Sequence, residues 1–328
     1  MPLELDYAAR LVETIGERLS FPINLRQGEG LSGLLFRAAS ENGYSCVYSL
    51  VHMIVSTREF VNVTPTALAK SLIFFDPNKL SRLLGCAPDA SVDQILYRPS
   101  DRGERYLLFF GREIRLKNFF AASRRVSPLS LRQSCHLKEI WNVRGLSFDP
   151  NTREQLLWKC PSCGNPLSYW HSFGVERCGK CFREGKNVDL REYSQKILPV
   201  DDEEAFKFAI RLIDPEYPVS RTKDLPIPSE LVEFGPGALF SLIVSLARHL
   251  SKYDRSIDQS FNAGLPPDKI ALAGRAILGW PDKFMEFADS VSKARDEHFG
   301  QCQSEVRARN LTKNPNFRRE TPLGRRVA

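Results

Sequence analysis

Residues 160–164 read CPSCG and residues 178–181 read CGKC, and these two stretches decide how the middle of the chain folds. Each CxxC pair forms a knuckle that offers two thiolates to one ion, and a glycine in or beside each pair relieves the tight backbone turn. Four thiolates close a tetrahedral shell, the arrangement of a structural zinc site and not of a catalytic one. The sequence therefore predicts one structural Zn²⁺ ion with the ligands Cys160, Cys163, Cys178 and Cys181.

Other uses of these cysteines are less well supported. An iron centre also uses paired cysteines, whereas a thioredoxin-like redox motif needs a single pair in a βαβ context. His171 lies between the two pairs and is a further candidate ligand, although four thiolates already complete the shell. The remaining cysteines are scattered, which is typical of small buried side chains: Cys46, Cys86, Cys135 and Cys302.

The composition is that of a folded protein. The chain has 328 residues, 42% of them hydrophobic, which is enough for two or three domains. No apolar run approaches the ~20 residues that span a bilayer, and the first turns of sequence lack the apolar core of a signal peptide. Clustered cysteines in a chain of this length favour metal ligation over disulfides. We therefore expect a cytoplasmic protein without a membrane segment.

Hydrophobic periodicity predicts a mainly α-helical protein. Residues 1–125 are expected to form an N-terminal domain of short helices that resembles helix-turn-helix packing, although a plain bundle without DNA contact has the same pattern. Residues 126–190 hold the knuckles in a zinc-ribbon-like domain, and residues 191–300 form a C-terminal helical domain. The basic tail, residues 301–328, has few apolar residues, so we expect it to lack fixed structure until it binds a partner.

Cap and turn signals place the individual elements. Asn42-Gly43 ends a helix that begins near Leu31, and Thr64-Pro65 and Asp76-Pro77 each open another. Residues 103–120 suggest a short strand or two. Further helices are expected over residues 47–56, 203–212, 237–250 and 268–278, and from residue 281 onward.

Positive charge is concentrated in two segments of a chain whose net charge is +7. Residues 102–144 hold ten basic and three acidic residues, a net +7, and residues 301–328 hold seven basic and two acidic residues, a net +5. Such localisation favours a phosphate-backbone partner, and the alternatives are a solubilising face and a tail that docks on protein. The candidate phosphate contacts are Arg115, Arg124, Arg125, Arg318, Arg319, Arg325 and Arg326.

Two segments resemble the TniQ family of transposon target-selection proteins. Residues 28–44 read GEGLSGLLFRAASENGY and resemble the family's opening helix: an acidic residue, a serine-led apolar stretch, an arginine, an alanine and an Asn-Gly stop. Residues 124–181 resemble its central region, in which a CPxC pair, a stretch with a tryptophan and a C-P-x-H group precede a CPxCG knuckle. A weaker resemblance in the C-terminal helices extends the match over most of residues 22–290.

The central region departs from the family pattern at its first knuckle. Residues 127–130 read SPLS where the first CPxC pair would be, and residues 149–152 read DPNT where the C-P-x-H group would be. Serine and threonine hydroxyls hold zinc poorly because they stay protonated at neutral pH. We therefore predict that the first knuckle survives as a fold held by packing, with its four ligands replaced by Ser127, Ser130, Asp149 and Thr152.

The resemblance implies a non-enzymatic adaptor in DNA transposition. Such proteins recognise target DNA, or a complex already bound to it, and recruit an AAA+ ATPase regulator that brings in the transposase. Some work with a CRISPR effector complex instead of reading DNA themselves. The sequence leaves open which of these modes applies, which DNA site is chosen and whether the chain forms a homodimer.

Catalytic signatures are scarce. No GxxxxGK[ST], HExxH or GxSxG motif occurs in the sequence. The acidic run at residues 201–204 is better explained as favourable charge at a helix N-terminus than as a two-metal nuclease. The alternative function is a zinc-ribbon transcription regulator or an RNA-binding module without a role in transposition. Association with an AAA+ ATPase would distinguish the adaptor from that alternative.

Overall fold

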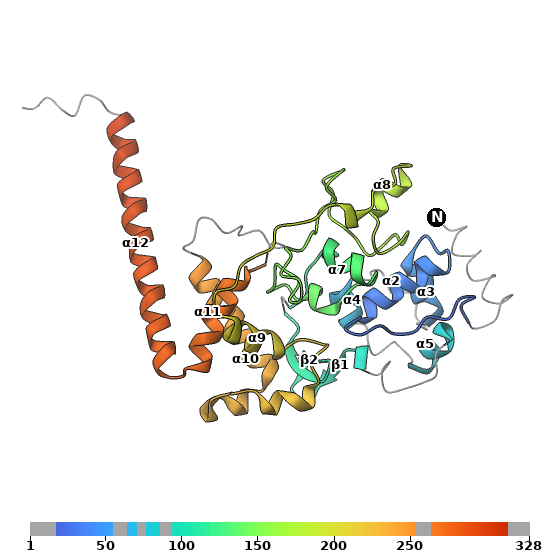
Figure 1. Cartoon of the computed structure of the whole chain (residues 1–328), viewed down its shortest axis with the longest axis horizontal. Helices are drawn as coiled ribbons and strands as arrows, with labels where there is room; N and C mark the ends of the chain where they lie inside the picture. Colours follow the sequence, from blue (N-terminus) through green and yellow to red (C-terminus); the bar gives the residue numbers. More distant parts are fainter. Residues whose placement is uncertain are drawn as a thin grey trace, which may run out of the picture.

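The computed structural model describes residues 18–54, 64–70, 77–85, 94–117, 119–252 and 264–313, with side chains as far as residue 298. Helices are the main regular structure in this part of the chain, and a small antiparallel sheet lies among them (Figure 1). The predicted mainly α-helical fold class is therefore confirmed. None of the helices in the described ranges has both the length and the hydrophobicity needed to cross a bilayer.

The N-terminal helices begin and end near the predicted signals. Helix α2 (Leu31–Glu41) ends at the Asn42-Gly43 pair, where Gly43 has a φ of +76° that favours glycine. Helix α2 packs against α3 and α4, and α3 packs against α5, an arrangement common to helix-turn-helix domains and plain bundles. The predicted ends of two helices, in residues 55–63 and 71–76, lie outside the described residues. The bounds are α3 Val47–Ile54, α4 Pro65–Lys70 and α5 Pro77–Leu84.

The sheet contains β1 (Arg98–Ser100), β2 (Gly103–Phe109) and β3 (Arg112–Arg115), paired antiparallel in that order. Leu107 pairs with Ile114, and both side chains are buried. The sequence predicted strands over residues 103–120 but not β1, whose three residues are too few to show an alternating pattern.

Between residues 119 and 200 the chain is held by short elements and isolated backbone bridges. This agrees with the weak helical periodicity of the region. The first knuckle begins at Ser127, which caps α7 by accepting a hydrogen bond from the Ser130 N–H. The short elements are α7 (Pro128–Gln133), the 3₁₀ turn η2 (Glu139–Asn142), α8 (Gly179–Arg183) and η3 (Leu190–Glu192).

The C-terminal helices pack on one another and on the sheet. Helix α11 lies against α9 and α10, and α10 lies against β3. A side chain at Gly237, in the first turn of α10, would overlap the Glu113 carbonyl, so glycine is required for this close approach. The bounds are α9 Glu203–Arg211, η4 Val219–Asp224, η5 Ser229–Phe234, α10 Pro236–Ser251, α11 Pro267–Leu278 and α12 Asp282–Lys313.

The acidic run before α9 has a structural role. The Asp202 carboxylate caps the helix by accepting a hydrogen bond from the Ala205 N–H over 3.0 Å. Arg275 on α11 donates two further hydrogen bonds of 2.7 Å to the same carboxylate. These contacts hold α9 against α11, which agrees with the interpretation of the run as helix-terminal charge.

The expectation that the whole tail, residues 301–328, lacks fixed structure was wrong for its first part. Helix α12 continues as far as Lys313, so residues 301–313 are helical where we expected no fixed structure. Its first turns pack on α11, and Figure 1 shows the rest of the helix extending away from the other elements. Residues 314–328 lie outside the described residues, and with them Arg318, Arg319, Arg325 and Arg326.

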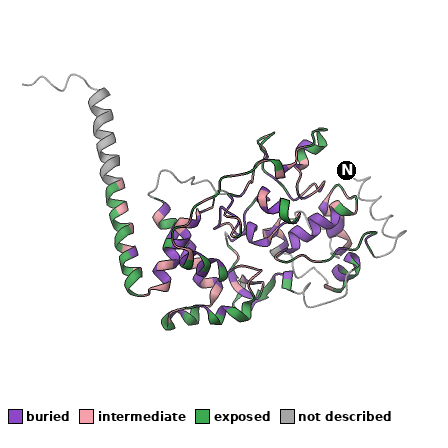
Figure 2. Cartoon of the chain, in the orientation of Figure 1, coloured by how far each residue is buried: buried purple, intermediate pink, exposed green. Residues whose placement is uncertain are grey.

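The buried apolar side chains form one cluster that runs from Leu19 to Phe287. The cluster crosses the boundaries expected at residues 125 and 190, and Figure 2 shows buried residues in the N-terminal, central and C-terminal helices alike. The central region therefore packs into the same core as the helices on either side of it.

A buried ion pair ties the segment that precedes α2 to the middle of the helix. Arg37 donates to both carboxylate oxygens of Glu29, over 2.8 and 2.7 Å, and also to the Asn24 carbonyl over 2.7 Å. The side chains of Glu29 and Arg37 are 0% and 5% exposed. Burial disfavours the charged guanidinium, but the hydrogen bonds and charge of Glu29 outweigh it and raise the pKa of Arg37. The acidic residue and the arginine of the N-terminal motif are thus partners inside the fold.

Replacing Arg37 with methionine should destabilise the chain by about 3–5 kcal/mol, because it leaves the Glu29 carboxylate buried and unpaired. Urea unfolding followed by circular dichroism measures the change. The double variant Glu29→Gln, Arg37→Met should recover part of the loss. A loss below about 1 kcal/mol for Arg37→Met would contradict the importance of the pair.

Candidate metal centre and nucleic-acid interface

The two CxxC turns bring four cysteines to one point. In the first turn the Gly164 N–H donates to the Cys160 carbonyl over 2.8 Å, and Gly164 has a φ of +68°. In the second, Cys178 stands at the N-cap of α8, and the Phe182 N–H donates to the Cys178 carbonyl over 3.0 Å. Each turn thereby directs its two sulfur atoms to the same side.

The sulfur positions fit a tetrahedral ion. The Sγ atoms of Cys160 and Cys181 are 3.7 Å apart, and those of Cys163 and Cys178 are 3.9 Å apart. All four lie within 4.8 Å of one another. Four sulfurs bound at 2.3 Å to one zinc ion would be about 3.8 Å apart. The four predicted ligands could therefore hold one metal ion, and His171 is not part of the group.

All four thiols can lose their protons together only when a bound cation compensates the negative charge. Burial and hydrogen bonds with the neighbouring cysteines raise the pKa of Cys181 to about 12. Burial acts in the same direction on Cys163, but hydrogen bonds from the backbone and side chain of Asn165 outweigh it and lower the pKa to about 7. A bound divalent ion supplies the positive charge that four adjacent thiolates require.

An aromatic stack lies beside this centre. The rings of Phe173 and Phe182 stack with centroids 4.5 Å apart, and the Arg177 guanidinium lies 5.2 Å from the centre of the Phe182 ring. Phe182 is 37% exposed. Such a surface can stack an unpaired base or pack against an apolar side chain of a protein partner.

Two of the predicted phosphate contacts are wrong. Arg124 and Arg125 are each 1% exposed, so neither guanidinium reaches a partner at the surface. Arg124 donates to the carbonyls of Val175 and Arg177, both over 2.6 Å. Burial lowers the pKa of each arginine to about 10, so both stay charged at neutral pH. Their positive charge serves the fold, which the sequence could not show because the acceptors are distant in the chain.

Arg125 has a similar structural role. Its guanidinium donates to the Leu146 carbonyl over 2.6 Å and to the Val143 carbonyl over 2.7 Å. These two bonds fix the loop that connects η2 to the rest of the central region. Arg124 and Arg125 therefore act on different loops although they are neighbours in sequence.

The four positions predicted to have lost zinc ligands lie in two turns that meet at Ser127 and Thr152. The Ser127 hydroxyl lies 3.4 Å from the Thr152 hydroxyl, and the Thr152 hydroxyl donates to the Asp149 carboxylate over 2.7 Å. Ser127 also donates to Glu154 over 2.5 Å, and the Trp141 indole N–H donates to Asp149 over 2.8 Å. The two turns at 127–130 and 149–152 are therefore joined by hydrogen bonds and buried carboxylates.

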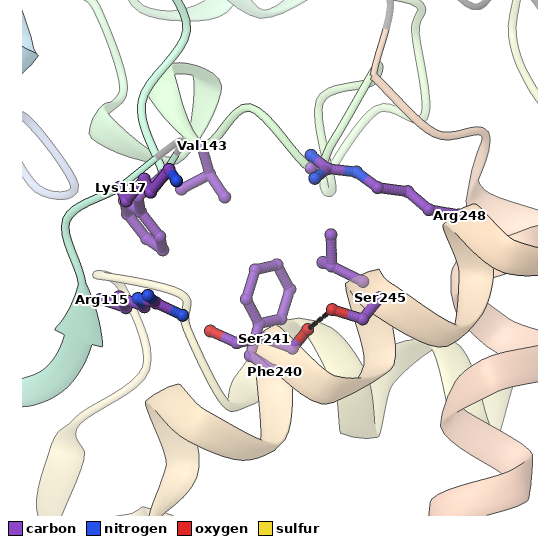
Figure 3. Close-up of a pocket in the computed structure, with 10 residues that line it drawn as sticks. Arg115, Lys117, Val143, Phe240, Ser241, Ser245 and Arg248 are labelled. Carbon is purple, nitrogen blue, oxygen red and sulfur yellow. Dashed lines mark hydrogen bonds between the residues drawn. The ribbon is translucent and has the colours of Figure 1, made fainter.

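Arg115, the third predicted phosphate contact in the described residues, is exposed at the end of β3. It lines a cavity of about 220 Å³ between β3 and α10, together with Lys117 and Arg248 (Figure 3). Sequence reasoning did not single out Arg248, because it lies far along the chain in a helix that reads as buried. The remaining predicted contacts, at positions 318, 319, 325 and 326, lie outside the described part of the chain.

No protein-family model matches the chain, and no curated protein matches it significantly. What the chain does is therefore inferred from its residues and their geometry.

The purified chain should contain one tightly bound metal ion, because the four sulfurs form a single closed group. Cys178→Ser should lose the ion, whereas Cys135→Ser, a control outside the group, should keep it. Elemental mass spectrometry gives the stoichiometry. Two ions in the unaltered chain would contradict the interpretation of the first knuckle, and none after purification without chelator would contradict the site itself.

Proposed function

We propose that the chain is a zinc-binding adaptor of DNA transposition, similar to TniQ proteins. It links target DNA, or a complex bound to that DNA, to an AAA+ ATPase regulator and through it to the transposase. The role is one of binding and not of catalysis. Zn²⁺ is the ion we assign to the cysteine group, because four thiolates in a closed tetrahedral shell are typical of structural zinc.

The observation that carries this proposal is the geometry of the first knuckle. The resemblance aligns residues 127–130 and 149–152 with two lost ligand pairs, and these pairs meet through the contact between Ser127 and Thr152. Unrelated loops 25 residues apart have no reason to converge on positions that a sequence pattern selects. Glu154 compensates for the missing ion, since its carboxylate joins the two turns and accepts from the Leu129 N–H over 2.7 Å.

The N-terminal motif supports the same proposal. Helix α2 begins directly on the segment between the two halves of the degenerate knuckle. A side chain at Gly30 would overlap the Glu139 carboxylate, and a Cβ at Gly33 would lie 3.0 Å from the Leu137 carbonyl. Gly30 and Gly33 thus allow α2 to pack closely on this segment. The two segments that resemble the family form one structural unit.

The aromatic stack beside the metal centre favours the alternative function, a regulator or RNA-binding module. The Phe182 ring stacks on Phe173 and lies beside the Arg177 guanidinium, and its exposed part can contact a base of an unpaired strand. A transposition adaptor predicts in addition a stable association with an AAA+ ATPase, which the alternative does not require.

A transposition assay tests the proposal. Cells carrying the transposase and AAA+ ATPase of the same element, with a donor DNA, should give insertions only when this chain is present, and the ATPase should co-purify with it. Cys178→Ser should lower insertion by at least about tenfold, whereas Cys135→Ser should not, because loss of the ion destabilises the central region. Normal insertion without the chain, or no association with the ATPase, would refute the adaptor and favour the alternative.

The degenerate knuckle can be tested by restoring its ligands. The fourfold variant Ser127→Cys, Ser130→Cys, Asp149→Cys, Thr152→His recreates the CPxC and C-P-x-H pairs of the family. It should bind two zinc ions per chain where the unaltered protein binds one.

Elemental mass spectrometry on the folded variant gives the count. The same four positions changed to alanine form the control and should leave one ion. A folded fourfold variant that binds a single ion would mean that these positions are not a former metal site.

A further inference from the structure

We propose that the cavity between β3 and α10 is the surface that holds the phosphate backbone of nucleic acid, with Arg115, Lys117 and Arg248 as its cationic contacts. The inference deepens the proposed function, on which it rests, because it names where the chain meets target DNA. It assigns a role to two residues, Lys117 and Arg248, that no sequence pattern singled out.

Three separate segments build the cavity. Arg115 and Lys117 come from the end of β3 and the turn after it, Val143 and Gly145 come from the loop after η2, and Arg248 comes from the last turns of α10. Figure 3 shows the two groups of basic side chains on opposite sides of the hollow, with Phe240 between them. The buried rings of Phe119 and Phe240 form an apolar floor. The cations therefore stand around a surface that itself offers water few hydrogen bonds.

The positive charge of the cavity is not neutralised within the described part of the chain. The described residues that line it include no aspartate or glutamate. Arg115, Lys117 and Arg248 form no ion pair among the described residues. In contrast, Arg102 on the neighbouring turn pairs with Glu113 over 3.2 Å. Cations that converge without a carboxylate leave a local positive potential, which an anion from outside can neutralise.

A second arginine, Arg144, lies near Arg248. The side chain of Arg144, which follows the cavity-lining Val143, is partly buried, and the adjacent charge of Arg248 further disfavours its charged form. Burial likewise lowers the pKa of Arg248. The two guanidinium groups therefore lie close enough to repel each other.

The remaining polar groups favour a phosphodiester over an acidic peptide. The Ser241 hydroxyl donates to the Gly237 carbonyl over 2.9 Å, and the Ser245 hydroxyl donates to the Ser241 carbonyl over 2.8 Å (Figure 3). Each hydroxyl uses its only proton in a hydrogen bond within α10, so neither can donate to a ligand. A peptide would bring backbone N–H and C=O groups that need partners, whereas a nucleic-acid backbone brings one charge per nucleotide and needs mainly cations.

The walls of the cavity are rigid. Arg125 fixes the carbonyls on both sides of Gly145, and Gly145 packs so closely on α10 that a Cβ there would lie 2.8 Å from Val244. At the other end, Gly237 brings α10 against β3. A preformed site of this kind binds without an ordering cost in its backbone.

The test is fluorescence anisotropy of the full-length, zinc-loaded chain with a labelled 30-base-pair DNA duplex, titrated over a range of salt concentrations. The variant Arg115→Ala, Arg248→Ala removes two cavity charges. Its matched control, Lys196→Ala, Lys223→Ala, removes two exposed charges elsewhere. The cavity variant should bind about tenfold or more weakly and should reduce the slope of log K against log salt by about 2, whereas the control should change neither.

A second pair of variants leaves all cations in place. Ser245→Asp puts a negative charge on the exposed face of α10 at the cavity, and Ser245→Asn provides an uncharged residue of the same size. The Asp variant should weaken DNA binding about tenfold and the Asn variant should not, with equal metal content and melting temperature in both.

The outcomes separate this inference from the proposed function. Equal losses in the cavity variant and its control would mean that only total charge counts, and would overturn the inference. Unchanged DNA binding with reduced capture of the AAA+ ATPase would make the cavity a protein-docking site, which also overturns it but leaves the adaptor standing. If the unaltered chain binds no duplex DNA, the inference fails, while the transposition assay still decides the function.

Discussion

Two adjacent buried arginines fix the loop before the second CxxC turn and the loop beside the basic cavity. Arg124 reaches the carbonyls of Val175 and Arg177 in the loop before the second CxxC turn, and its guanidinium lies 4.6 Å from the ring centre of Phe36 on α2. Arg125 turns to the loop that forms one wall of the basic cavity. Because each guanidinium is buried, its charge is tolerated only while these carbonyls surround it, and the loops are ordered only while the guanidinium is present.

The cysteine group and the predicted first knuckle each join two loops, by different means. Both must join two loops that have no regular backbone pairing of their own. In the second knuckle, sulfur atoms from both loops can share one ion, and three of the four cysteines are at most 3% exposed within the common core. In the first, Ser127, Thr152 and two buried carboxylates form a hydrogen-bonded network. Such a network is stable only when every member is satisfied, so it tolerates substitution no better than a metal site does.

Features with a local cause could be predicted from the sequence, and features with a distant cause could not. The CxxC spacing, the Asn42-Gly43 stop and the first-turn prolines depend on neighbouring residues, and the structure has them where the sequence indicated. The burial of Arg124 depends on carbonyls more than fifty residues away, and the position of Arg248 beside β3 depends on how α10 packs. The helical segment 301–313 was missed for another reason, since a high density of charge does not prevent helix formation when most residues have good helix propensity.

Counting charge along the sequence did not separate the exposed cations from the buried ones. Of the ten basic residues between positions 102 and 144, Arg112, Arg124 and Arg125 are each 1% exposed and donate to backbone carbonyls. A buried arginine that donates to several carbonyls stabilises the fold and is not accessible to an anion. It therefore adds to the net charge without adding a binding site. The surface potential depends on the cations that form no ion pair among the described residues, and near β3 these include Arg248, contributed by a helix outside the basic segment. A basic segment therefore becomes a binding surface only where folding leaves its cations without internal partners.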